Sequence, residues 1–176
     1  MDNSNNFFSS EKPQKPLQIA FKFGFFLLIA EYVRNLLCSV TPGAISFLIY
    51  LAFITLVYAY ICYKGVVVFK TSNGGKATFW QCYNVSMQIF LFFAVISSLV
   101  LFLTAAMNPE ATDSIVQEFE KQSKFQSLPS SEKNMLLKMA SIFTQPPVMA
   151  LSSLLVTALG GSILSLFVSM FATSDK

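Results

Sequence analysis

The chain has 176 residues, of which 54% are hydrophobic and only 12% are charged, about half of the roughly 25% typical of a soluble domain. The mean hydropathy is +0.58. Several runs of uncharged residues are longer than about 18 residues, the length that indicates a transmembrane helix. This composition excludes a soluble globular protein and predicts one membrane-embedded domain. The net charge is only +3 and the basic residues are scattered, so nucleic acid is not an expected partner.

Residue types suited to metal or haem chemistry are scarce. The sequence contains no His, and its three cysteines, Cys38, Cys62 and Cys82, form no CxxC pair. We therefore expect no metal and no cofactor, and we expect each cysteine to be a buried apolar residue. Lipid attachment at Cys38 is not expected either, because the large Leu37 precedes it.

The first predicted span covers residues 17–40 and contains Lys22, Glu31 and Arg34. Its apolar stretch is longer than that of a signal peptide and is followed at once by another, so we interpret it as a retained helix. The preceding residues 1–16 are rich in Asn, Ser, Gln and Lys, which predicts a disordered cytoplasmic tail.

The second predicted span covers residues 44–69, after a helix break at Thr41-Pro42-Gly43. Ser72-Asn73-Gly74-Gly75 then predicts a turn. A β-hairpin around Asn73-Gly74 is the alternative, since residues 66–69 are mostly β-branched. We favour the turn between helices because both flanks are spans.

The third and fourth predicted spans cover residues 77–107 and 147–172, within uncharged runs. The segment 108–146 between them carries nine charged residues and predicts two short amphipathic helices. Asn108-Pro109-Glu110 should begin the first, whose apolar face includes Ile115 and Phe119. The second has an apolar stripe and should end at Pro146-Pro147; the stripe consists of Leu136, Met139, Ala140 and Phe143. The expected fold is thus an all-α polytopic membrane protein with four transmembrane helices in residues 17–174.

Lys and Arg counts predict the orientation. The amino-terminal side carries Lys12, Lys15 and Lys22, and the loop between spans two and three carries Lys64, Lys70 and Lys76 without an acidic residue. The segment 108–146 holds four Lys and five acidic residues. The positive-inside rule therefore predicts that both termini and residues 63–76 are cytoplasmic.

Glu31 and Arg34 lead the candidates for function, because ionisable groups inside a membrane are costly. Their i, i+3 spacing puts both on one helix face, so the favoured interpretation is an intramembrane ion pair. The alternative is a proton or ion relay, for which the remaining spans supply no second carboxylate.

Two further patterns are typical of helix packing. Gln81, Asn84 and Gln88 form an amide stripe on span three, which we interpret as hydrogen bonding to neighbouring helices. On span four, small residues recur at four-residue intervals and predict a close helix–helix contact, inside the bundle or with a partner; they are Ser153, Thr157, Gly161, Ser165 and Ser169.

Three classes of function remain: a non-catalytic membrane protein that binds or organises partners, a small transporter or channel subunit, and a membrane enzyme. No nucleophile with a base, no paired carboxylates and no phosphate-binding glycine motif are present, so we expect no enzyme. The first class is favoured and the transporter is the alternative. The expected partners are the lipid bilayer and either another membrane protein or further copies of the chain.

The order of several motifs resembles a bacterial membrane family known as domain of unknown function 4199, over about residues 17–173. The motifs are Phe69-Lys70, Gly74-Gly75 followed by Thr78-Phe79-Trp80-Gln81, Pro109-Glu110, Pro147, and a last span with Gly161 and Ser165. The resemblance implies a four-helix protein of the inner membrane. It implies no catalytic residues, because the family has no assigned activity.

Overall fold

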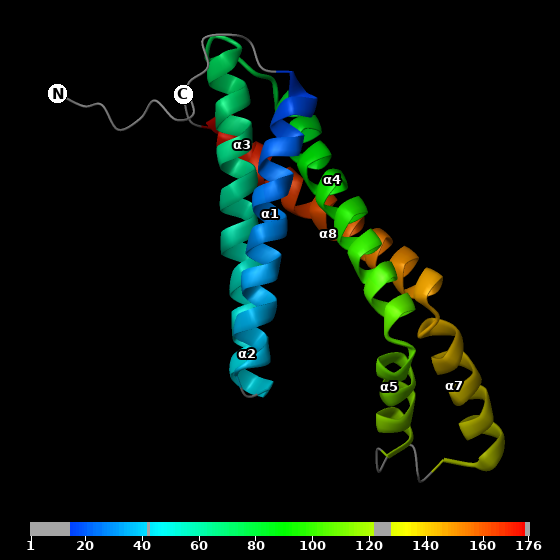
Figure 1. Cartoon of the computed structure of the whole chain (residues 1–176). Helices are drawn as coiled ribbons and strands as arrows, with labels where there is room; N and C mark the ends of the chain where they lie inside the picture. The colour runs from blue at the N-terminus through cyan, green and yellow to red at the C-terminus, as the bar shows by residue number, and fades with distance from the viewer. Residues whose placement is uncertain (1–14, 42, 122–127, 175–176) are drawn as a thin grey trace. The chain divides into compact units, whose positions relative to one another are not determined.

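The computed structural model describes residues 15–41, 43–121 and 128–174, and every regular element in these ranges is a helix. Figure 1 shows them in chain order. The elements are α1 (Pro16–Ser39), α2 (Gly43–Ala52), η1 (Phe53–Tyr58), α3 (Ala59–Ser72), α4 (Phe79–Met107), α5 (Pro109–Lys121), α7 (Ser130–Phe143) and α8 (Pro146–Ser174). The tail predicted at residues 1–16 lies almost wholly outside the described residues.

Four helical stretches are long and apolar enough to cross a membrane. They are Pro16–Ser39, Gly43–Ser72, Phe79–Met107 and Pro146–Thr173. The shorter α5 and α7 come between the third and the fourth in the sequence. The prediction of an all-α chain with four apolar spans is therefore confirmed.

The second span is one continuous helix with a π-helical segment at its centre. α2 runs into η1, and η1 runs into α3, with helical backbone angles at the junction residues Ala52 and Ala59. The Thr55 hydroxyl donates a hydrogen bond to the Leu51 carbonyl oxygen at 2.8 Å. A π turn rotates the faces of the helix relative to one another, and such segments often lie at functional sites.

The turn between α3 and α4 is a glycine-capped helix end, so the alternative β-hairpin does not form. Gly74 and Gly75 have φ of 68° and 77°, which glycine adopts without strain. The Gly75 N–H donates to the Lys70 carbonyl at 2.9 Å and the Gly74 N–H to the Thr71 carbonyl at 3.2 Å. This is the paired bonding of a Schellman motif.

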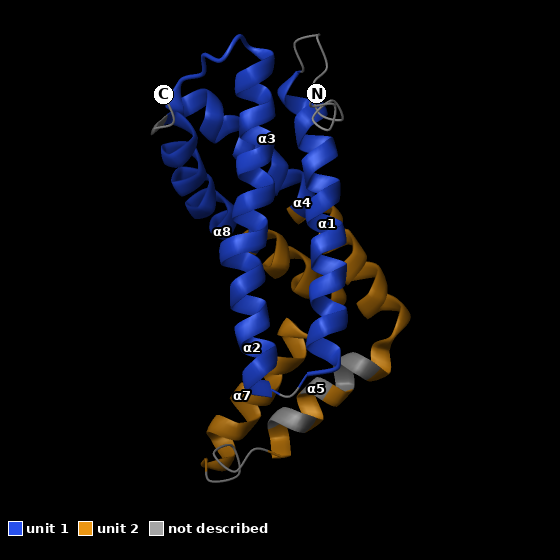
Figure 2. Ribbon diagram, turned by 90° about the vertical axis from the view of Figure 1, so that its left-hand side faces the viewer, with its two compact units in different colours: residues 1–93, 157–176 blue, residues 94–156 orange. Residues whose placement is uncertain are grey.

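The helix contacts divide the chain into two compact units, residues 1–93 with 157–176, and residues 94–156 (Figure 2). In unit 1, α1 runs beside the α2–η1–α3 helix (Figure 1). The core of this unit consists of apolar side chains from four parts of the chain. They are Ile19, Ala20, Phe23 and Leu27 from α1, Tyr58, Cys62, Val66 and Phe69 from η1 and α3, Cys82, Val85, Ile89, Phe90 and Phe93 from α4, and Val168 and Ala172 from α8. Cys62 and Cys82 are buried as expected, whereas Cys38 is only half-buried.

In unit 2, α5 and α7 pack on each other. α5 begins at Pro109, with Glu110 in its first turn and Lys121 in its last, which suits the helix dipole. The side chains of Ile115 and Phe119 lie outside the described part of the chain. α7 ends at Phe143, before Pro146-Pro147. The helix thus ends before the two prolines, and Pro146 begins α8, because proline suits the first helical position.

One face of α7 exposes large apolar side chains. Met135, Met139, Ile142 and Phe143 are 45% to 62% exposed, although Leu136 and Ala140 of the expected stripe are half-buried. An apolar face of this kind suits the headgroup boundary of a bilayer. We expect a peptide of residues 108–145 to be largely unfolded in buffer and to gain helix in anionic micelles, as measured by circular dichroism.

A matched pair of variants tests the role of this face. Met139→Asp should reduce the helix gained in micelles, because it places a charge on the apolar face. Asn134→Asp adds the same charge at an exposed polar position and should have a smaller effect. A cooperative thermal transition of the peptide in plain buffer would show instead that α5 and α7 form a soluble domain.

Candidate functional site

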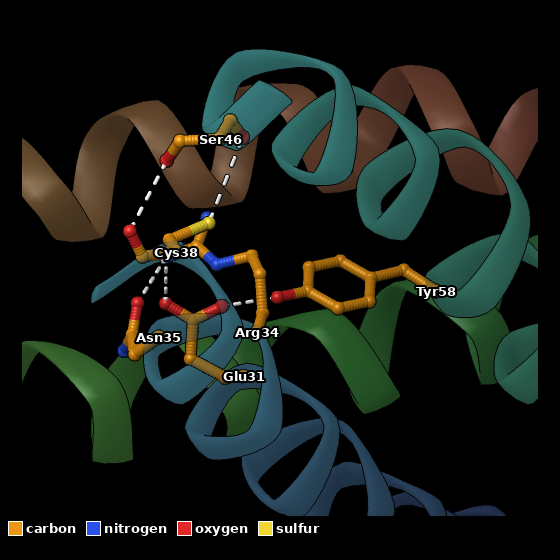
Figure 3. Close-up of polar contacts among 6 residues, drawn as sticks. All are labelled: Glu31, Arg34, Asn35, Cys38, Ser46 and Tyr58. Carbon is orange, nitrogen blue, oxygen red and sulfur yellow. Dashed lines mark hydrogen bonds and ion pairs between the residues drawn. The ribbon is translucent and has the colours of Figure 1, made fainter. Parts of the chain in front are cut away.

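The most polar group of side chains within the spans is centred on Glu31 of α1 (Figure 3). Arg34 Nη2 donates to Glu31 Oε1 at 2.5 Å, and the Tyr58 hydroxyl donates to the other carboxylate oxygen, Oε2. We call Glu31, Arg34, Asn35, Tyr50 and Tyr58 the Glu31 cluster. Both oxygens of its carboxylate are thus engaged by side chains of the same chain.

Arg34 is held on several sides. Its Nη2 atom also donates to Asn35 Oδ1 at 2.9 Å, and its guanidinium carbon lies 4.6 Å from the centroid of the Tyr50 ring. The Arg34 side chain is 14% exposed and that of Glu31 is 24% exposed. A guanidinium over an aromatic face gains a cation–π attraction, which is stronger where water is excluded. The geometry therefore neutralises and partly desolvates both charges.

The π-helical segment η1 positions Tyr58. Tyr58 is the last residue of η1, is buried, and packs edge-on against Phe93 of α4 with ring centroids 5.7 Å apart. Its hydroxyl thereby reaches Glu31, which lies 27 residues earlier. Sequence reasoning missed Tyr58, although a phenol inside an apolar span signals that its hydroxyl needs a buried partner.

Further along, the end of α1 is tied to the start of α2. Cys38 Sγ donates to the Ser46 carbonyl oxygen at 3.6 Å, and Ser46 Oγ donates to the Cys38 carbonyl oxygen at 3.5 Å (Figure 3). These contacts fix the hairpin that brings Tyr50 over Arg34. Cys38 thus serves as a packing and hydrogen-bonding residue.

The chemistry available to the Glu31 cluster is limited by its own bonding. A proton relay needs an acceptor that faces Glu31 from another span, and Glu31 is the only carboxylate that the sequence places in the spans. Its two oxygens are instead occupied by a guanidinium and a phenol. The arrangement resembles a structural ion pair more than a transfer site.

The residues of the predicted amide stripe bond within α4. Gln88 Nε2 donates to Asn84 Oδ1 at 3.2 Å. Gln81 accepts from the Thr78 N–H at 2.9 Å, while the Gln81 N–H donates to Thr78 Oγ1 at 3.3 Å. These reciprocal bonds form a capping box at the start of α4. The expectation that Gln81 bonds to a neighbouring helix is therefore corrected, because its side chain satisfies the N-terminus of its own helix.

Some of the small residues of α8 are buried, and Gly161 among them lies in close contact with α4. Gly161, Ser165 and Ser169 are buried, whereas Ser153 and Thr157 are half-buried. A Cβ atom added to Gly161 would lie 2.6 Å from Phe90 Cβ and 2.7 Å from Phe90 Cγ. One residue further, Tyr83 and Ser162 share a hydrogen bond of 3.0 Å. The contact within unit 1 is thus one that only glycine fits.

An open pocket of about 440 Å³ lies beside the turn between α3 and α4, and sequence reasoning missed it. We call it the cationic pocket; its lining includes Lys70, Gly75, Lys76, Thr78, Gln81 and Thr173. Lys70 Nζ donates to the Ala172 carbonyl oxygen at 2.9 Å and so ties α3 to the end of α8. The lysines, glycines and capping residues that lie close together between Phe69 and Gln81 are the feature of the sequence that could have indicated this pocket.

The model of a protein family matches residues 19–174, which is most of the chain and includes both the Glu31 cluster and the cationic pocket. This family is known as "Protein of unknown function (DUF4199)". The chain belongs to this family. No curated protein and no solved structure matches it.

Membership of DUF4199 confirms the resemblance in the sequence. The residues that carry this resemblance between Phe69 and Gln81 form the capped end of α3, the capped start of α4 and most of the lining of the cationic pocket. Together with the four apolar helices, the family assignment describes a multi-pass membrane protein of unknown activity.

Proposed function

We propose that this chain is a non-catalytic accessory or scaffold subunit of the bacterial inner membrane, which binds another membrane protein or further copies of itself. The observation that carries the proposal is the internal pairing of polar side chains in the spans. Glu31 is bonded to Arg34 and Tyr58, and Asn84 is bonded to Gln88. The bond from Tyr58 to Glu31 joins two helices, and side chains that are paired with one another leave substrate or ions with fewer groups to bind.

In the proposed orientation, both termini and residues 63–76 are cytoplasmic and residues 108–146 lie outside. Lys64, Lys70 and Lys76 support this orientation through the positive-inside rule. The inner membrane is proposed because the resemblance in the sequence is to a bacterial family.

A small transporter or channel subunit is the second candidate. One observation favours it: three buried polar atoms of the described residues have no hydrogen-bond partner, namely Arg34 Nε, Ser86 Oγ and Ser165 Oγ. A polar path would need several such groups along one line. The two halves of the sequence show no similarity of the inverted-repeat kind that many transporters have.

Purification of the full chain in mild detergent distinguishes these functions. An accessory subunit should elute in a complex of fixed stoichiometry, with a partner or with itself, as measured by light scattering and mass spectrometry. The same preparation in liposomes should pass no more protons than its Glu31→Gln variant. A monomer that conducts protons, with conduction lost in Glu31→Gln, would contradict the proposal and favour the transporter.

A further inference from the structure

The cationic pocket has a charge pattern that the proposed function does not use. Among the described residues that line it, both charged side chains are lysines, Lys70 and Lys76. The chain from residue 59 to residue 109 contains no acidic residue. A concave site that gathers charge of one sign raises the local concentration of the opposite ion.

The backbone around the pocket also favours an anion. The capping box of Thr78 and Gln81 holds the first turn of α4 against the pocket. The capping box already occupies the Thr78 and Gln81 N–H groups, so this end of α4 acts on an anion through the helix dipole, which makes it partly positive. Lys70, held by its contact with the Ala172 carbonyl, also lines the pocket.

Aromatic side chains indicate the depth of the pocket in the membrane. Trp80, next to the pocket residue Gln81, is 70% exposed and stacks edge-on against Phe79 and Tyr83, with centroids 5.3 Å and 5.9 Å away. Trp and Tyr gather where the acyl chains meet the headgroups. An exposed Trp80 beside the pocket is therefore consistent with a pocket at the level of the lipid headgroups.

We propose that the cationic pocket binds a phosphate group, carried by the headgroup of an anionic phospholipid. Lys76 is an exposed ligand on the glycine-rich turn, and Lys70 is the positioning residue on α3. The volume of about 440 Å³ accommodates a headgroup, and the open mouth allows its acyl chains to remain in the bilayer. The proposal concerns a lipid ligand and holds whether or not the chain is an accessory subunit.

Trp80 is the single tryptophan of the chain, so its fluorescence reports on this end of the protein alone. The full chain in detergent micelles is titrated with phosphatidylglycerol, with phosphatidylcholine and, separately, with inorganic phosphate. We expect phosphatidylglycerol to change the fluorescence saturably, with a midpoint that rises as salt is added. Phosphatidylcholine, which carries no net charge, should act only at much higher concentrations.

Matched variants assign the effect to the pocket. Lys76→Gln should weaken phosphatidylglycerol binding about fivefold. This corresponds to a binding free energy of about 1 kcal/mol for one lysine near an anionic surface. Lys64→Gln removes the same charge from α3 outside the pocket, where Lys64 Nζ lies 5.5 Å from the centroid of the Tyr60 ring. It should bind as the wild type does.

The remaining outcomes separate the sources of the phosphate. If inorganic phosphate saturates the signal at millimolar concentration and Lys76→Gln weakens it, the pocket binds phosphate but the lipid assignment is wrong. Equal weakening by Lys76→Gln and Lys64→Gln would show binding by general surface charge and would overturn the site. Unchanged binding in Lys76→Gln would overturn it as well.

Discussion

Gly161→Leu should lower the stability of the chain in detergent by about 3 kcal/mol, the upper end of the cost of overpacking. A Cβ atom at this position would already lie 2.6 Å from Phe90 Cβ, which is close to the backbone of α4 and cannot swing away. The two helices must therefore separate. For a chain of this size the loss corresponds to a melting temperature lower by roughly 6–12 °C, measurable by a thermal shift assay.

The adjacent glycine provides the control. A Cβ atom added to Gly160 has nothing within 4 Å, so Gly160→Leu should leave the melting temperature unchanged or raise it, since leucine favours helix more than glycine. Both variants add the same side chain to neighbouring positions of α8. Equal melting temperatures for the two variants would show that the contact between Gly161 and Phe90 does not stabilise the chain.

Arg34→Gln should be the second strongly destabilising change. It leaves the Glu31 carboxylate with Tyr58 as its remaining hydrogen-bond donor among the described side chains, although Glu31 is only 24% exposed. Removal of one partner of a buried ion pair costs about 3 to 5 kcal/mol, because the other charge is left without compensation. The melting temperature in detergent should fall accordingly.

A double-mutant cycle isolates the pair. Glu31→Gln/Arg34→Gln carries no uncompensated charge and should recover at least half of the stability lost in Arg34→Gln. Tyr58→Phe removes one hydrogen bond while it keeps the ring against Phe93, so it should cost about 1 kcal/mol. Additive effects of Glu31→Gln and Arg34→Gln would contradict a coupled ion pair.

Helix ends marked by local residue types could be predicted from the sequence. Pro16, Pro109 and Pro146 each occupy the first position of a helix, and Gly74 with Gly75 ends α3, because these residues fix backbone angles by themselves. The capping role of Gln81 was equally local, since Thr78 stands three residues before it. The spacing of Gln81, Asn84 and Gln88 predicts one amide stripe, but the hydrogen bonds of Gln81 are made to Thr78 at the start of its own helix.

Features that depend on distant residues could not be predicted in the same way. The π-helical segment η1 occurs where Tyr58 reaches Glu31 across 27 residues, and no residue within 53–58 is a proline or glycine that would signal it. The cationic pocket needs Thr173 beside Lys70, which are brought together by the bond from Lys70 to Ala172. Helical periodicity identifies the faces of each helix but not which faces meet.

Cysteine labelling tests the central claim that four spans alternate across the membrane. In a chain with Cys38, Cys62 and Cys82 replaced by alanine, single cysteines are introduced by Lys15→Cys, Val40→Cys, Asn73→Cys, Asn134→Cys and Ser174→Cys. An impermeant maleimide is applied to intact spheroplasts. The proposed topology predicts labelling at positions 40 and 134, and labelling at positions 15, 73 and 174 only after lysis. Labelling of position 73 together with position 134 in intact spheroplasts would contradict it.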